Sequence, residues 1–143
     1  MKIFLRKYAN IILRKFVSFA HAQIRDWESV EKILLAKVVM ETDSWKKGDC
    51  ILSKKEFRVY SQWGDDGIIQ YLIQVLNLKS DSFIEFGVSD FYESNTHFLM
   101  VNNNWRGFVI DGSVDNVNKI KNSPIYWRYD LQAISSFVTA DNM

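Results

Sequence analysis

The chain has 143 residues, of which 48% are hydrophobic and 24% are charged. These values are typical of a soluble globular protein with one hydrophobic core, and they exclude a disordered chain. One cysteine cannot form an intramolecular disulfide, and two histidines without a cysteine cluster do not make a zinc site. We therefore expect a cytoplasmic protein without a structural metal.

The net charge of +1 conceals an uneven distribution of charged residues. Residues 1–25 hold 6 of the 18 basic residues and no acid, so they carry +6. Residues 26–143 hold the remaining 12 basic residues and all 17 acids, so they carry −5. Attraction to anionic lipid or phosphate is therefore expected of the first segment alone, and we expect no nucleic-acid partner.

The N-terminal third is predicted to be helical. Apolar residues recur at helical spacing over 2–24, with basic residues on the other side, and a second helix is predicted over 26–41. Its expected buried side comprises Trp27, Val30, Ile33, Leu34, Val38 and Met40. Such a first helix either lies on a membrane surface or packs against a partner helix; its charges exclude a membrane span. Polar residues 42–60 indicate a linker, so residues 1–56 form a basic helical arm and linker.

A βαβ pattern is predicted over the rest of the chain, residues 57–143. A turn at 61–67 precedes an amphipathic helix through Leu76, and the apolar run 82–87 predicts a buried strand that ends at Gly87. Asp90 and Glu93 resemble a helix N-terminal cap, which predicts a helix over about 91–103.

Two further units continue this pattern. Phe108–Ile110 predict a strand that ends on Asp111, followed by a helix over 114–120. After a break at Pro124, residues 125–129 predict a third strand ending on Asp130, with a last helix from Ala133. Strands separated by helices in this way indicate parallel βαβ units. The expected fold is α/β, a partial Rossmann-like parallel sheet of about three strands preceded by an α-helical arm.

Ligands of such sheets bind outside the carboxyl ends of the strands. Gly87 would let a ligand approach the backbone, and Asp111, 24 residues later, could accept hydrogen bonds from ribose hydroxyls. A dinucleotide fingerprint needs two further glycines, and the residues after Gly87, Ser89 and Phe91 among them, supply none. The loop therefore favours a nucleoside without a pyrophosphate, which disfavours a dinucleotide-dependent oxidoreductase.

These residues resemble a known family. The sequence EFGVSD at 85–90 is similar to motif I of class I S-adenosylmethionine-dependent methyltransferases, and VIDG at 109–112 is similar to the acidic end of their second strand. With SQWGDDG at 61–67, ESNT at 93–96, NWRG at 104–107 and TADN at 139–142, the ordered set resembles a bacterial and phage branch of FkbM-type methyltransferase-like proteins.

The resemblance implies S-adenosylmethionine as the cofactor and assigns roles to individual residues. Gly87 and its loop, with Ser89 in place of a usual glycine, would hold the methionine part, and Glu85 would hold that loop or its water. Asp111 would take the ribose hydroxyls and Gly112 would border the adenine. The remaining assignments are Asp130 and Leu131 at the adenine amino edge, and Gln62 and Asp65 closing over the methionine end.

Each of these residues also has a purely structural interpretation. Glu85 could be a strand carboxylate bound by neighbouring amides, and Asp111 and Asp130 could cap turns. His97 is expected on a helix surface rather than as a base. No residue is identified as a general base.

The complete family fold has seven strands, so this chain is expected to be truncated or one part of a split protein. We expect a methyltransferase acting on a glycan or small metabolite, or alternatively a non-catalytic remnant or assembly module. In the second case the basic helix at 1–25 would bind a membrane or a partner. The sheet would also have an unpaired strand edge, so we expect the chain to self-associate or to bind a second chain that completes the sheet.

Overall fold

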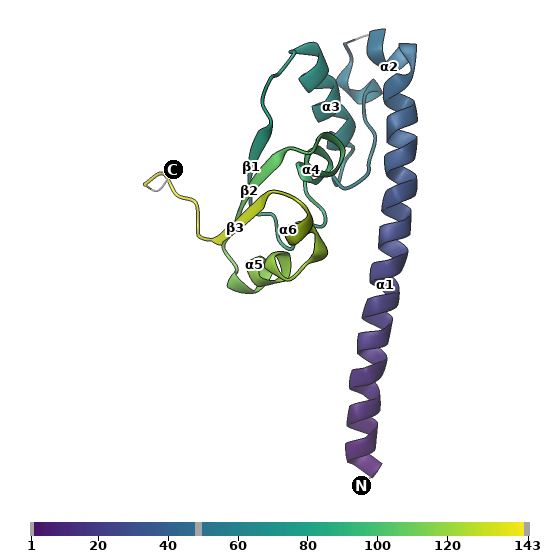
Figure 1. The fold of residues 1–143 in the computed structure, drawn as a ribbon, viewed down its shortest axis with the longest axis vertical. Helices are drawn as coiled ribbons and strands as arrows, with labels where there is room; N and C mark the ends of the chain where they lie inside the picture. The colour runs from purple at the N-terminus through teal and green to yellow at the C-terminus, as the bar shows by residue number, and fades with distance from the viewer. Residues whose placement is uncertain (1, 48–49, 142–143) are drawn as a thin grey trace.

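The computed structural model describes residues 2–47 and 50–141, apart from the side chains at 2–9, 11, 22, 25 and 26. A long helix runs beside a small α/β domain, and its amino-terminal half extends beyond that domain (Figure 1). In chain order the elements are α1 (Lys2–Glu41), α2 (Asp43–Lys47), the 3-10 helix η1 (Leu52–Lys54), α3 (Asp65–Val75), β1 (Ser82–Phe86), α4 (His97–Asn103), β2 (Arg106–Asp111), α5 (Val114–Lys121), α6 (Pro124–Arg128) and β3 (Leu131–Ser135).

The three strands form one parallel sheet in the order β1-β2-β3. In its register, Ile84 of β1 pairs with Phe108 of β2, and Val109 of β2 pairs with Ala133 of β3. This arrangement confirms the predicted fold class, a partial Rossmann-like α/β fold.

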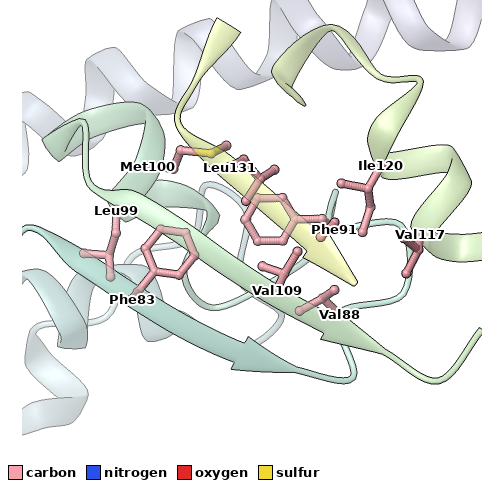
Figure 2. Packing of buried hydrophobic residues seen from close by; sticks show 10 residues of the cluster. Phe83, Val88, Phe91, Leu99, Met100, Val109, Val117, Ile120 and Leu131 are labelled. Carbon is pink, nitrogen blue, oxygen red and sulfur yellow. The ribbon is translucent and has the colours of Figure 1, made fainter. Parts of the chain in front are cut away.

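One face of the sheet carries the hydrophobic core. Side chains of alternate strand residues point toward α4 and α5, and the loop after β1 adds two more (Figure 2). The cluster comprises Phe83, Val88, Phe91, Leu99, Met100, Val109, Val117, Ile120, Leu131 and Ala133. Since these crossover helices contribute to the same cluster, they lie on the same side of the sheet.

The opposite face of the sheet is open to solvent. It presents Ile84, Phe86 and Ile134 with 63%, 50% and 41% of their surfaces exposed. Phe108 and Ile110 between them are only half-buried. Parallel sheets are ordinarily covered on both faces, so this face is an unusually large apolar surface for a small domain. We call these five residues the open sheet face.

The third βαβ unit differs from the prediction. Residues 124–128 form α6, not a strand, and the strand begins only at Leu131. Ser123 and Pro124 stand at the N-cap and first position of a helix, where proline is favoured, and this local signal outweighs the β-forming Ile125 and Tyr126. Asp130 consequently precedes a strand instead of ending one.

Two predicted helix boundaries are also wrong. The helix expected over about 91–103 is α4, which begins only at His97. Asp90 and Glu93 do not cap it, because residues 87–96 form a bent loop. A helix from Ala133 is wrong as well, since β3 continues to Ser135. The last two residues of the expected helix lie outside the described residues.

Helix α1 is continuous where two helices were predicted. Residues 2–41 contain no glycine or proline, so nothing in the sequence breaks the helix near residue 25. Its predicted buried side is mostly wrong: Trp27, Leu34 and Val38 are 72%, 59% and 65% exposed. Ala36 is buried instead, against Val59, Tyr60 and Phe98, with Ile33 and Met40 partly buried beside it.

The region predicted as a linker packs into the domain. Trp45 of α2 is buried, and its ring lies edge-on to Tyr71 of α3. Lys55 is only 1% exposed, and its Nζ donates to the carbonyl oxygens of Trp45 at 2.6 Å and Ser44 at 3.2 Å. The contact between Trp45 and Tyr71 crosses the predicted boundary between residues 1–56 and 57–143 and ties α2 to α3, whereas the Lys55 hydrogen bonds lie within residues 1–56.

Within the residues that the structure describes, every helix is too short or too polar to cross a lipid bilayer.

Candidate functional site

The loop after β1 has an uncommon backbone conformation. Gly87, Ser89 and Phe91 have φ angles of 69°, 52° and 64°, all in the left-handed region. Left-handed serine and phenylalanine are strained, and such strain is often found at ligand-binding loops. A Cβ atom built on Gly87 would meet nothing within 4 Å, so the loop borders open space at this point. The buried Phe91 ring anchors the loop in the core.

Asp111, the last residue of β2, holds this loop in place. Its Oδ2 accepts a hydrogen bond of 2.8 Å from the Ser89 amide, and its Oδ1 accepts from the Ser113 amide at 2.8 Å and from Asn116 Nδ2 at 3.1 Å. Burial raises the pKa of Asp111, but these three hydrogen bonds outweigh it and leave the pKa below its usual value. The carboxylate is therefore ionised at the carboxyl edge of the sheet, where the sequence predicted it.

Glu85 binds the start of α4. Its two carboxylate oxygens accept from the amides of Asn95 at 3.1 Å and Thr96 at 3.0 Å, and also from the Thr96 hydroxyl. A carboxylate at a helix N-terminus satisfies amides that have no partner in the helix. Glu85 thus connects β1 to the far end of the 87–96 loop and is a strand carboxylate bound by neighbouring amides, as in its structural interpretation.

Gly112 lies under an aromatic ring. A Cβ atom on Gly112 would be 2.6 Å from the Phe137 ring, so the absence of a side chain lets the ring approach the backbone. Phe137 itself is 77% exposed. Sequence reasoning missed this residue because it follows a strand that was not predicted.

The segment that contains Gln62 and Asp65 is fixed by Asp66. The Asp66 Oδ2 accepts from the amides of Val59, Tyr60 and Ser61 at 2.8–2.9 Å, and its Oδ1 is buried without a hydrogen bond. Burial raises the pKa of Asp66 despite these three amides. Gln62 is exposed in the turn and Asp65 is half-buried at the start of α3. The turn therefore has a rigid base and an exposed tip.

His97 connects that turn to the loop after β1, a connection the sequence did not reveal. Its ring stacks on Tyr60 with 3.8 Å between centroids and on Phe91 with 5.0 Å. Only 3% of the residue is exposed, so the prediction of a surface histidine is wrong. Burial lowers the pKa of His97 to about 4, which keeps the ring neutral. The His97 ring thus packs between Tyr60, next to the 61–67 turn, and Phe91 of the loop after β1.

Asp130 and Leu131 lie at the other end of the sheet. Leu131 pairs with Gly107 near the amino end of β2, and the Asp130 carbonyl accepts from the Gly107 amide at 2.8 Å. Asp111 is at the carboxyl end of β2, so the strand separates the two acids. Placing Asp130 and Leu131 beside an adenine at the Asp111 site was wrong, because the third strand starts where it was predicted to end.

No family model, curated protein or solved structure matches this chain. Among the described side chains, no three His, Cys, Asp or Glu gather as metal ligands would. The candidate site therefore consists of Gly87, Ser89, Asp111, Gly112 and Phe137, with Glu85 behind the loop.

Proposed function

We propose that the chain binds S-adenosylmethionine at the carboxyl edge of β1 and β2 as part of a methyltransferase domain. The observation that carries the proposal is the hydrogen bond from the left-handed Ser89 to Asp111, which joins the loop after the first strand to the acid of the second. Ligands of open α/β sheets bind at this edge. A glycan or small metabolite is the proposed acceptor, and a cytoplasmic location is proposed.

Each residue of the site has a role in this proposal. The methionine part of the cofactor would lie along the open side of Gly87, where a Cβ has no neighbour within 4 Å. An ionised carboxylate can accept about four hydrogen bonds. Among the described residues three donate to Asp111, and Ser89 alone donates to its Oδ2, so a ribose hydroxyl could bind there. The exposed Phe137 ring above Gly112 would stack on the adenine.

The reaction proposed is displacement at the sulfonium methyl group. A lone pair of the acceptor would attack the methyl carbon as the carbon–sulfur bond breaks, and the proton of the acceptor would pass to solvent. Such a transfer depends mainly on holding the two reactants in line. His97 is buried and neutral, so we do not assign it as the base.

Titration calorimetry with S-adenosylmethionine and with its demethylated product tests the cofactor site. Asp111→Asn keeps the size of the side chain but removes its charge, and should weaken binding by about 1.5–3 kcal/mol for each charge-assisted bond lost. Asp130→Asn, at the opposite edge of the sheet, is the matched control and should leave affinity unchanged. Equal affinities of wild type and Asp111→Asn, with both proteins folded by circular dichroism, would disprove the assignment.

A second function, a non-catalytic assembly module, is favoured by a different observation. The open sheet face and the exposed half of α1 both present apolar side chains to solvent. This function would be favoured over the first if calorimetry detected no binding of S-adenosylmethionine or its demethylated product and light scattering showed concentration-dependent association.

A further inference from the structure

Among the side chains of α1 that the structure describes, one narrow stripe packs on the domain. Ser29, Ile33, Ala36 and Met40 follow each other at steps of four, three and four residues, and all are buried or half-buried. The contacts include Ala36 against Val59 and Phe98. These four contact residues lie in the last third of the helix.

A second stripe lies on the other side of α1, and all of its members are exposed except Ala20, which is half-buried. Its members alternate at steps of four and three residues, which is the heptad spacing of coiled coils. They are Leu13, Val17, Ala20, Ile24, Trp27, Glu31, Leu34 and Val38. The offset of two residues between Trp27 and Ser29 corresponds to about 200°, so this stripe faces away from the domain. We call it the outer seam.

The apolar exposure along the outer seam is large. Leu13, Ile24 and Trp27 are 59%, 56% and 72% exposed, and Leu34 and Val38 are 59% and 65% exposed. A shallow groove runs beside the seam from Leu13 to Glu28. Single exposed apolar residues are ordinary, but a row of this length, interrupted only by Glu31, marks an interaction surface.

The charges beside the outer seam identify the partner. One flank carries Arg14, His21 and Glu28 at steps of seven residues, so a basic and an acidic residue stand at equal distances from His21. In two antiparallel copies this flank faces itself, and Arg14 of each copy meets Glu28 of the other. Parallel copies would instead pair His21 with Phe16 and Glu28 with Gln23, without any ion pair.

The sizes of the seam residues favour the same orientation. The antiparallel register that pairs Arg14 with Glu28 also places Val17 against Trp27 and Ala20 against Ile24. Small side chains thus face large ones, which fills a helix interface without gaps. A parallel pair would place Trp27 against Trp27 and Ala20 against Ala20.

We propose that two copies of this chain associate through the outer seams of their α1 helices, antiparallel and centred between Ala20 and Ile24. A membrane surface is the other occupant to consider for a basic helix. Glu28 lies beside the seam and would face an anionic bilayer, whereas in the pair it meets Arg14 of the second copy. Glu31, on the seam itself, would lie opposite Leu13 of the second copy and favours neither occupant. The charge pattern therefore favours a second copy.

Sedimentation equilibrium of the full chain over a concentration series tests the seam. Ile24→Glu should convert the dimer to a monomer, whereas Phe19→Glu, at an exposed position off the seam, should leave the dimer in place. Both variants should melt like wild type in the domain, since neither residue contacts it. The proposal would be overturned if the wild type were a monomer at about 100 μM, or if the two variants lost association equally. If such a monomer floated with anionic vesicles, the seam would be assigned to membrane binding instead.

A charge swap tests the orientation. Arg14→Glu alone should raise the dimer dissociation constant about tenfold, because it turns two attractive contacts into repulsive ones. Arg14→Glu combined with Glu28→Arg should restore the wild-type constant, whereas Lys15→Glu, with the same charge change off the flank, should have little effect. Failure of the double variant to recover would overturn the antiparallel register.

Discussion

Replacing Gly67 with alanine should destabilise the domain, although alanine is the better helix former. Gly67 lies in the first turn of α3, and a Cβ atom there would be 2.1 Å from the carbonyl oxygen of Lys55 and 2.5 Å from the amide nitrogen of Phe57. Both atoms belong to the backbone, so no side-chain rotation relieves the overlap. The helix would have to move away from residues 55–57 by roughly an ångström, given ordinary van der Waals separations.

The magnitude follows from three contributions. Overpacking against backbone should cost about 3 kcal/mol, at the upper end of the usual range. The hydrogen bond from the Gly67 amide to the Phe57 carbonyl oxygen, 3.3 Å long, would be lost at a cost of about 1 kcal/mol. The helix propensity of alanine returns about 1 kcal/mol. We therefore expect the free energy of unfolding to fall by about 3 kcal/mol.

Urea denaturation followed by circular dichroism measures this difference, and Gly87→Ala provides the contrast. Gly87 has a φ of 69° but open space around its Cβ position, so alanine there should cost only about 1–2 kcal/mol of backbone strain. Gly67, in contrast, does not have a positive φ, but its Cβ position is occupied by neighbouring backbone. If Gly67→Ala were as stable as wild type, or less damaging than Gly87→Ala, the close contact between α3 and residues 55–57 would be refuted.

Three further predictions concern buried groups and the open sheet face. Because the pKa of His97 is about 4 when folded and near 6.5 when unfolded, the unfolded state binds more protons between these values, so stability should fall by up to roughly 3 kcal/mol as pH drops from 6.5 to 4. In His97→Phe this contribution to the slope should be absent, so stability, measured by urea denaturation at several pH values, should fall less steeply than in wild type. Asp66→Ala removes the acceptor of three buried amides and should lower the unfolding free energy by about 3 kcal/mol or more in the same assay; a loss below about 1 kcal/mol would contradict this. In an Ile24→Glu background, Ile84→Lys should reduce any remaining association in light scattering, since Ile84 is 63% exposed on the open sheet face.

The parts of the fold that the sequence predicted are those with a regular pattern and a matching local signal. The apolar run of β1 ends at a glycine whose φ only glycine adopts easily, and α5 follows Ser113, whose side chain accepts from the Asn116 amide. The predicted site at Gly87 and Asp111 follows from these two strand ends. Both residues are at one edge because parallel strands place their carboxyl ends together.

The errors arise where local signals compete or where tertiary contacts decide. Ile125 and Tyr126 favour a strand, but the preceding Ser123-Pro124 starts a helix, and this one error displaced Asp130 to the wrong end of the sheet. The buried side of α1 depends on where the domain docks, and exposed apolar residues lie on more than one side of this helix, so its sequence does not reveal that. His97 was misplaced for the same reason, because its burial depends on Tyr60 and Phe91.

The unbroken length of α1 fixes the geometry of any pair that it forms. In the proposed register, residue 35, at the centre of the domain contact, lies opposite residue 9 of the other copy. These positions are 26 residues apart along one helix, which corresponds to about 40 Å at 1.5 Å per residue. The two domains would then stand at opposite ends of a stiff spacer, too far apart to cover each other's open sheet faces. Such a molecule is bivalent, and against a repetitive target two weak contacts at a fixed spacing would raise the avidity by about 10²–10⁴ without any new contact.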